Sequence, residues 1–217
     1  ARVIRFCDLL IERGYNLNIW AYARVDTIPD NLLPRMKKAG INWICLGIES
    51  GNEEVRANVN KTLKRDIVSS VRKLQAHGIY IIGNYMFGLP DDTLATMQET
   101  LDLATELNCE FANFYAVMAY PGSDLYDRAA AAGTVPDRWE AFSQHSYWTQ
   151  PLPTQHLSAA EVLAFRDEAF QKYFRHPSYQ AMIRQRFGDK VCAHVEKMLS
   201  MPIARRLTEQ RTPAAGV

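Results

Sequence analysis

Apolar positions in the first two thirds of the chain follow two different periods. Short apolar runs typical of strands occupy residues 18–22, 43–47, 79–87 and 111–118. Between and around them, apolar residues recur every three or four positions. This spacing indicates amphipathic helices at residues 2–13, 30–38, 53–58, 65–77, 94–107 and 124–132. Strands that alternate with helices predict βαβ units and a parallel sheet, the pattern of an α/β fold.

The length of this alternating region limits the fold. A complete (β/α)8 barrel needs roughly 200–250 residues in such a pattern. Only residues 1–132 follow it here, so we expect a partial TIM-type barrel with parallel strands.

The pattern changes after residue 132. Residues 133–157 form a proline-containing linker that is rich in aromatic side chains, including Trp139, Tyr147 and Trp148. These aromatic residues either line a substrate entrance or pack the end of the chain against the barrel. The sequence leaves both interpretations open.

Beyond the linker the sequence predicts helices alone, at residues 158–174, 178–187 and 189–200. Ser158 and Glu161 form a capping box at the start of the first of them. We therefore divide the chain into a partial barrel (1–132), a linker (133–157) and a C-terminal helical segment (158–217). The tail at residues 212–217 is small, contains proline and glycine, and is expected to be disordered.

The composition of the chain mainly argues against certain classes of protein. The chain of 217 residues is 47% hydrophobic and carries 25 basic and 24 acidic side chains, a net charge of +1. This balance predicts neither a nucleic-acid groove nor a basic membrane patch. No apolar run approaches the roughly 20 residues that span a bilayer. The charged start of the chain does not resemble a signal peptide.

The four cysteines, Cys7, Cys45, Cys109 and Cys192, lie dozens of residues apart. No pair has metal-ligand spacing, so the chain is expected to hold no metal site of its own. Cys45 and Cys109 lie among apolar residues and are expected to be buried. This cysteine usage fits a reducing compartment, and we expect a cytoplasmic protein.

Candidate chemistry lies where the predicted strands end, because parallel α/β folds bind ligands beyond the carboxyl ends of their strands. Arg24 and Asp26 follow the first strand, Glu49 ends the second, and Asn84 lies in the third. Each has a simpler interpretation. Glu49 is suited to cap the helix that follows, and Arg24 with Asp26 is suited to form a surface ion pair. An amide in an apolar strand such as Asn84 needs hydrogen-bond partners.

Taken together, these segments resemble the radical S-adenosylmethionine (SAM) superfamily. They are most similar to the branch that often carries an N-terminal cobalamin-binding domain. The resemblance is carried in order by WAYARVD at 20–26, MKKAG at 36–40, LGIESG at 46–51, NK at 60–61, FGLPDDT at 87–93 and AYPGSDLY at 119–126. The family more often has Gly-Glu before the threonine of the fifth motif.

The resemblance implies that this chain contributes the third to sixth strands of the family's barrel, which contact SAM. Glu49 would bind the SAM ribose, and Asn84 would face it. Lys61 would approach the SAM carboxylate or ribose, at a position where related enzymes often have arginine.

Further SAM contacts are implied by the same resemblance. Arg24 would lie near the methionine part of SAM or near the substrate. Ser50 belongs to the same Gly-x-Glu-Ser segment as Glu49. The backbone from Tyr115 through Ala116 to Met118 would contact adenine.

The chain departs from the family in one large respect. The family's first strand is followed by a C-x-x-x-C-x-x-C motif whose thiolates hold a [4Fe–4S] cluster. The sequence contains no such motif, and the first two strands of the family's barrel are not present. We therefore expect a fragment of a radical SAM enzyme that is inactive alone. The intact enzyme would cleave SAM reductively to drive hydrogen abstraction or methylation of an unknown substrate. Cobalamin is a candidate second cofactor.

Two other functions stay open. One is a short protein that binds a nucleotide-like ligand or a partner without redox chemistry. The other is an acid–base enzyme with Glu49 or Asp26 as the base, which the lack of histidine at the strand ends disfavours. The strand at 18–22 is expected to form an exposed sheet edge that invites pairing with another chain, a second copy of this one included.

Overall fold

The computed structural model describes residues 2–59, 61–63 and 66–209. Expectations that concern Asn60, Arg65 and residues 212–217 therefore lie outside the described residues. The strands are β1 (Ile19–Arg24), β2 (Ile41–Glu49), β3 (Tyr80–Phe87) and β4 (Phe111–Ala116). The α-helices are α1 (Arg2–Glu12), α2 (Leu33–Lys38), α3 (Glu53–Asn58), α4 (Ile67–Ala76), α5 (Leu94–Leu107), α6 (Asp124–Ala131), α7 (Ala159–Arg175), α8 (Pro177–Phe187), α9 (Asp189–Ser200) and α10 (Arg206–Glu209).

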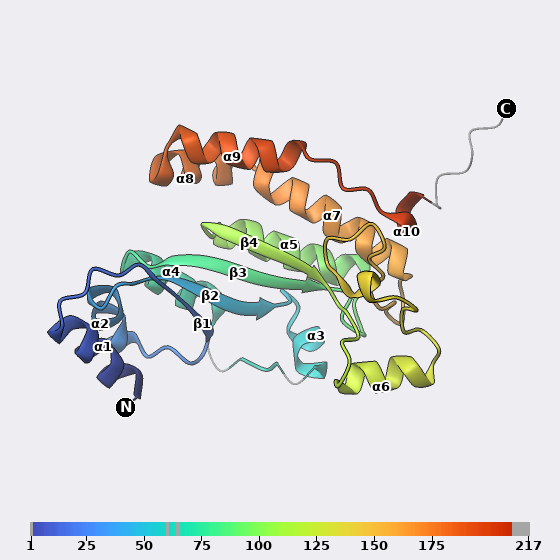
Figure 1. Cartoon of the computed structure of the whole chain (residues 1–217), viewed down its shortest axis with the longest axis horizontal. Coiled ribbons are helices and arrows are strands. Elements are labelled where there is room, and N and C mark those ends of the chain that lie inside the picture. Colours follow the sequence, from blue (N-terminus) through green and yellow to red (C-terminus); the bar gives the residue numbers. More distant parts are fainter. Residues whose placement is uncertain (1, 60, 64–65, 210–217) are drawn as a thin grey trace.

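The four strands form one parallel sheet in the order β1-β2-β3-β4 (Figure 1). Each strand is followed by helical structure before the next strand begins. This stepwise order is that of a segment of a (β/α) barrel. The predicted fold class, an α/β partial barrel with a helical C-terminal segment, is confirmed.

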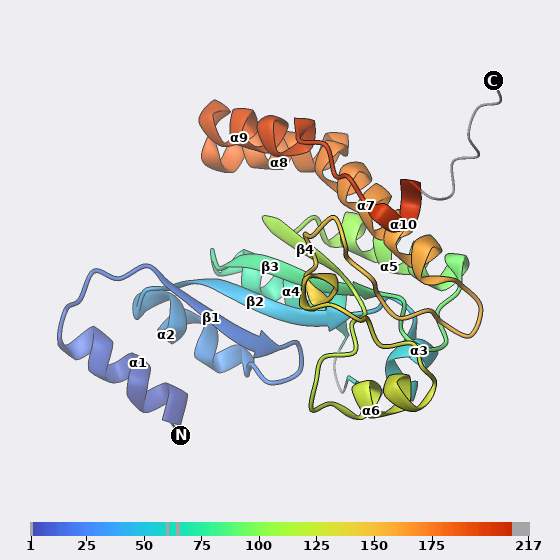
Figure 2. The same cartoon turned by 45° about the vertical axis from the view of Figure 1, so that its right-hand side comes forward.

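Helices α2, α4 and α5 cover one face of the sheet (Figure 1). Side chains from alternate strand positions point into this layer, and the most buried of them include Leu46, Ile81 and Phe114. The opposite face is much more open. Tyr22, in the edge strand, is 76% exposed there. In Figure 2, β1 lies at the edge of the sheet, and α1 packs beside α2.

Helix α7 continues the covered side of the sheet, and α8 then crosses to the amino-terminal ends of the strands. Helix α7 packs beside α5 and β4, where the Tyr173 hydroxyl donates a hydrogen bond to the Cys109 carbonyl at 2.7 Å. Helix α8 reaches the amino-terminal ends of the strands, and Phe187 packs against Trp43 and Tyr80 there. Among the described helices, none combines the length and apolarity that crossing a bilayer requires.

Side-chain caps explain where several helices start. Thr93 begins α5 in a reciprocal capping box with Thr96, and Ser158 does the same for α7 with Glu161, as predicted. Asn52 caps α3 by accepting a hydrogen bond from the Val55 amide at 3.0 Å. Glu49 is therefore not the cap of this helix, and its carboxylate is left for other contacts.

Candidate active site

A row of four residues crosses the sheet from the carboxyl end of β1 to the middle of β4. Arg24, Gly47, Asn84 and Asn113 are paired in register from β1 to β4. Residues paired in this way project to the same face of a sheet. This is the face that also carries the exposed Tyr22, two positions before Arg24. We call these four residues the polar row.

Glu49 joins the polar row through an irregularity in its strand. The register of β2 against β3 shifts between Gly47 and Glu49, and the backbone of Glu49 takes a positive φ of 68°. Its side chain folds back over Gly47, because a Cβ added to Gly47 would lie 2.8 Å from Glu49 Oε1. The carboxylate thus lies on the same open face as Asn84.

Two cations flank this carboxylate. Lys61 Nζ lies 3.2 Å from Glu49 Oε1. Arg24 forms a two-pronged pair with Asp26, at 3.1 and 3.2 Å. The hydrogen bond to Asp26 and its charge raise the pKa of Arg24, and the charge of Glu49 raises it further. The surface ion pair that the sequence suggested for Arg24 is present, and it holds the guanidinium near the row.

The amide of Asn84 is held in place by its neighbours. Its nitrogen donates to Cys45 Sγ at 2.8 Å and to the Leu46 carbonyl at 3.2 Å. Its oxygen accepts a hydrogen bond from Asn113 Nδ2 at 3.0 Å. Burial raises the pKa of the Cys45 thiol, which keeps it protonated. The partners of this half-buried amide are therefore supplied by the two neighbouring strands, β2 and β4.

Three other candidates lie differently. The Ser50 hydroxyl is buried and shares a hydrogen bond with Thr100 on α5, so it points away from the polar row. The Ala116 amide and carbonyl are both paired with the side chain of Gln144. Tyr115 lies on the open face, and partial burial raises the pKa of its hydroxyl. The adenine contact was expected from the backbone, and the backbone of Ala116 is already paired, whereas the side chain of Tyr115 lies on the open face.

Comparison with known proteins adds to this geometry. The family model described as the radical SAM superfamily matches residues 4–104, a stretch that contains β1 to β3 and most of α5. The matched stretch contains five of the six motifs that carry the resemblance, and it confirms the family that they indicated.

Two curated relatives are similar over more than half of this chain. An uncharacterized methyltransferase of Pyrococcus horikoshii is 26% identical over 121 residues, which are 55% of this chain and 26% of that protein. The anaerobic magnesium-protoporphyrin IX monomethyl ester cyclase of Rubrivivax gelatinosus is 25% identical over 181 residues, 82% of this chain and 32% of the cyclase. The chain thus spans a third or less of the length of these relatives.

Solved structures of two radical SAM enzymes are also similar. Coproporphyrinogen III oxidase (HemN) of Escherichia coli aligns with a TM-score of 0.48 and 22% identity, covering 62% of this chain and 31% of HemN. The methyltransferase TsrM of Kitasatospora setae, solved with cobalamin and a [4Fe–4S] cluster, aligns with a TM-score of 0.47 and 15% identity, covering 52% of this chain and 24% of TsrM.

The radical SAM superfamily implies an iron–sulfur cluster, and the cysteines of this chain do not fit one. All four are buried free thiols, three of them on α1, β2 and α9 and Cys109 between α5 and β4, and the predicted burial of Cys45 and Cys109 is confirmed. Among the described residues, no three histidine, cysteine or acidic side chains come together as a metal site. The four cysteines are therefore not placed to ligate one cluster together.

A metal measurement follows from this arrangement. We expect the purified 217-residue chain to stay colourless after anaerobic reconstitution with iron and sulfide, because three thiolates cannot converge on one cluster. Iron analysis and the visible absorption spectrum are the readouts. Stoichiometric iron with a cluster absorption band would contradict the expectation.

The linker aromatics contact the end of the described chain. The Tyr147 hydroxyl donates to Glu209 at 2.7 Å, and its carbonyl accepts from the Arg206 amide at 3.0 Å. The guanidinium of Arg206 lies 5.4 Å from the Trp148 ring centre. These contacts favour packing over a substrate entrance for both residues. Trp139 is 77% exposed, so these packing contacts do not decide between the two interpretations for this residue.

Proposed function

We propose that this chain is the SAM-binding part of a radical SAM enzyme. The intact enzyme would cleave SAM reductively at a [4Fe–4S] cluster whose ligands lie outside the chain. One observation carries the proposal. The polar row, Glu49 and Lys61 gather a carboxylate, two amides and two cations on the open face, toward the end of the strands where parallel α/β folds bind ligands.

The chemistry of these groups suits the parts of SAM. A carboxylate accepts hydrogen bonds from vicinal hydroxyl groups, so Glu49 is suited to the ribose diol. Asn84 supplies an amide beside it. Lys61 and Arg24 carry positive charge that is suited to the carboxylate of the methionine part. Bound SAM would supply the sulfonium centre whose reductive cleavage starts radical chemistry.

The reaction is proposed at the level of a class. One relative is described as a methyltransferase and another as a cyclase, so we propose methylation or hydrogen abstraction on an unknown substrate. Cobalamin is proposed as a second cofactor, because the motifs resemble the branch of the superfamily that often carries a cobalamin-binding domain.

The division of the chain at residues 132 and 157 is also kept as a proposal. Its support is local. Helix α6 ends at Ala131, and the next α-helix starts at Ala159.

Strand β1 pairs with β2 alone among the described residues, so its other side is available to a further strand. That strand would belong to the same enzyme or to a second copy of the chain.

Binding of S-adenosylhomocysteine tests the proposed role of Glu49. We expect Glu49→Ala to weaken binding to the 217-residue chain by about 10- to 100-fold. A lost hydrogen bond to a charged group costs roughly 1.5–3 kcal/mol, and each 1.4 kcal/mol is tenfold. Isothermal titration calorimetry gives the dissociation constants.

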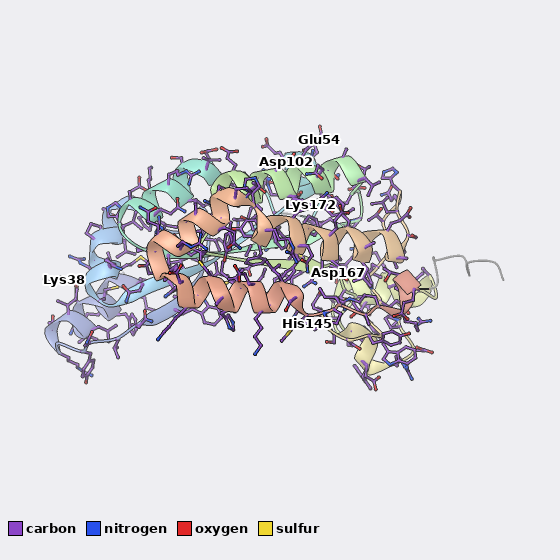
Figure 3. The ribbon with its side chains drawn as sticks, turned by 90° about the horizontal axis from the view of Figure 1, so that it is seen from above. Lys38, Glu54, Asp102, His145, Asp167 and Lys172 are labelled. Atoms are coloured by element: carbon purple, nitrogen blue, oxygen red, sulfur yellow. The ribbon has the colours of Figure 1, made fainter. Side chains whose placement is uncertain are left out.

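A matched control is available on the neighbouring helix. Glu54→Ala removes an exposed carboxylate on α3, labelled in Figure 3, and should leave the affinity unchanged. Equal affinity of the wild type and Glu49→Ala would remove Glu49 from the site. If the wild-type chain binds the nucleoside but the whole gene product makes no cluster, a nucleotide-binding protein without redox chemistry becomes the better interpretation.

A further inference from the structure

A cavity of about 430 Å³ lies beside the candidate site, between the free edge of β4, helix α7 and the segment at residues 201–205. Asn113 and Tyr115 line it from the strand. Both also belong to the open face, and Asn113 donates to Asn84 in the polar row. The cavity is therefore continuous with the face proposed to bind SAM, and a molecule inside it would lie next to that face.

Two buried guanidinium groups share one carboxylate at the wall of this cavity. Arg166 and Arg205 are 5% and 2% exposed. Arg166 Nη1 lies 2.7 Å from Asp167 Oδ1, and Arg205 Nε lies 2.9 Å from Asp167 Oδ2. Asp167 is the one acidic side chain that the described residues bring into ion-pair contact with either arginine. The trio thus carries one positive charge in excess, in a place that water reaches poorly.

His145, which also lines the cavity, responds to the positive charge of the two arginines. Partial burial lowers the pKa of this imidazole, and the charges of Arg166 and Arg205 lower it further. Figure 3 shows His145 and Asp167 on the same side of the molecule, away from Lys38. The neutral imidazole adds no charge to the cavity, so the excess charge is that of the arginine pair.

The two arginines differ in how many of their nitrogens donate hydrogen bonds. All three nitrogens of Arg205 donate hydrogen bonds, to Asp167, Thr149 and neighbouring carbonyls. Arg166 donates through Nε to the Phe114 carbonyl at 2.8 Å and through Nη1 to Asp167. Its Nη2 has no partner among the described residues, although Arg166 lines the cavity. This nitrogen is a free, charged donor at a concave site.

The rest of the cavity wall is mostly apolar. It includes the side chains of Phe170, Met198, Met201 and Ile203. A ligand that fits both ends therefore needs one anionic group and a carbon-rich body. A single excess charge and a single free donor suit a monoanion better than a phosphate dianion.

We propose that this cavity is the substrate pocket and that it binds an organic carboxylate with an apolar or aromatic body. Arg166 binds the carboxylate. The body lies between α7 and the segment at residues 201–205, against Asn113 and Tyr115. The assignment as a substrate pocket rests on the proposed SAM-binding function, whereas binding of the acid itself does not.

The test compares two probes of nearly the same shape and different charge. Indole-3-propionate and its neutral amide, indole-3-propionamide, are titrated into the full 217-residue chain by calorimetry at physiological salt. We expect the acid to bind at least tenfold more tightly than the amide. Inorganic phosphate at the same concentration should not displace the acid. Equal binding of acid and amide, or displacement by phosphate, would overturn the proposal.

Variants locate the binding. Arg166→Gln removes the free donor and leaves Arg205 paired with Asp167, so the buried charges balance and the fold is retained. It should abolish the preference for the acid, whereas Arg184→Gln, at an exposed ion pair with Asp189, should keep it. Met201→Trp fills the apolar end without touching the charges and should block both probes. Preference for the acid that survives in both Arg166→Gln and Met201→Trp would place its binding elsewhere and refute the assignment.

The outcomes separate this proposal from the function it rests on. Binding of S-adenosylhomocysteine that depends on Glu49, without preference for the acid, rejects the carboxylate pocket alone. Preference for the acid that depends on Arg166, without any nucleoside binding, supports the pocket and rejects the SAM-binding face.

Discussion

Asp167→Asn is expected to lower the free energy of unfolding by about 3–5 kcal/mol, because breaking a buried ion pair leaves its partner uncompensated. Asp167 is the shared counter-ion of Arg166 and Arg205, which are both buried. The asparagine side chain still accepts hydrogen bonds but carries no charge, so two guanidinium groups would lie together without an anion. Urea denaturation followed by circular dichroism measures the change.

Asp189→Asn is the matched control for this result. Asp189 pairs with Arg184 at 3.1 Å, but both side chains are exposed, and such pairs contribute little. We expect its unfolding midpoint to match that of the wild type. A loss for Asp167→Asn as small as that for Asp189→Asn would show that water or another anion compensates the arginine pair.

Asp92→Ala is expected to lower the free energy of unfolding by about 2–6 kcal/mol, because it leaves two buried backbone amides without an acceptor, at roughly 1–3 kcal/mol each. Asp92 Oδ2 accepts from the amides of Gly88 and Leu89, at 3.0 and 2.9 Å. Its Oδ1 accepts from the Thr96 hydroxyl at 2.7 Å. The carboxylate is 1% exposed, and this burial raises its pKa. It fixes the turn that follows β3, next to the candidate site.

Two variants separate this effect from general damage to the turn. Asp92→Asn keeps an oxygen acceptor of the same shape and should retain most of the stability. Asp91→Ala removes the neighbouring carboxylate, whose partners Asn58 and Gln155 are exposed, and should change the melting temperature little. A melting temperature for Asp92→Ala equal to that of Asp91→Ala would contradict the hydrogen-bond explanation.

The sequence pattern predicted helices better than strand ends. Helix α5 has the predicted bounds, Leu94–Leu107, because a capping threonine and a long apolar period mark it. Strand β2 is longer than the predicted run at 43–47, since its ends are set by pairing with β1 and β3 rather than by apolar side chains. Helix α10 was not predicted, and it contacts α7 as well as Tyr147 and Trp148 in the linker.

The candidate site was predictable where a residue follows the strand-end rule. Arg24 and Asn84 lie in the polar row because strand alternation places them there. The position of Glu49 depends on a register shift and a positive φ that no local pattern reveals. The pairing of Asp167 with Arg205 was missed, because it joins distant residues through a segment without sequence motifs.

The arginine pair also ties a distant segment to the sheet. Helices α8 and α9 lie between Asp167 and Arg205 in the sequence, yet Arg205 Nε lies 2.9 Å from Asp167 Oδ2. The segment at residues 201–205 forms one wall of the cavity, so the cavity exists only while this segment is docked on α7. We expect a chain truncated before Arg205 to keep its sheet, because Asp167 then has Arg166 as its partner, and to lack the anion site, because the excess charge is gone.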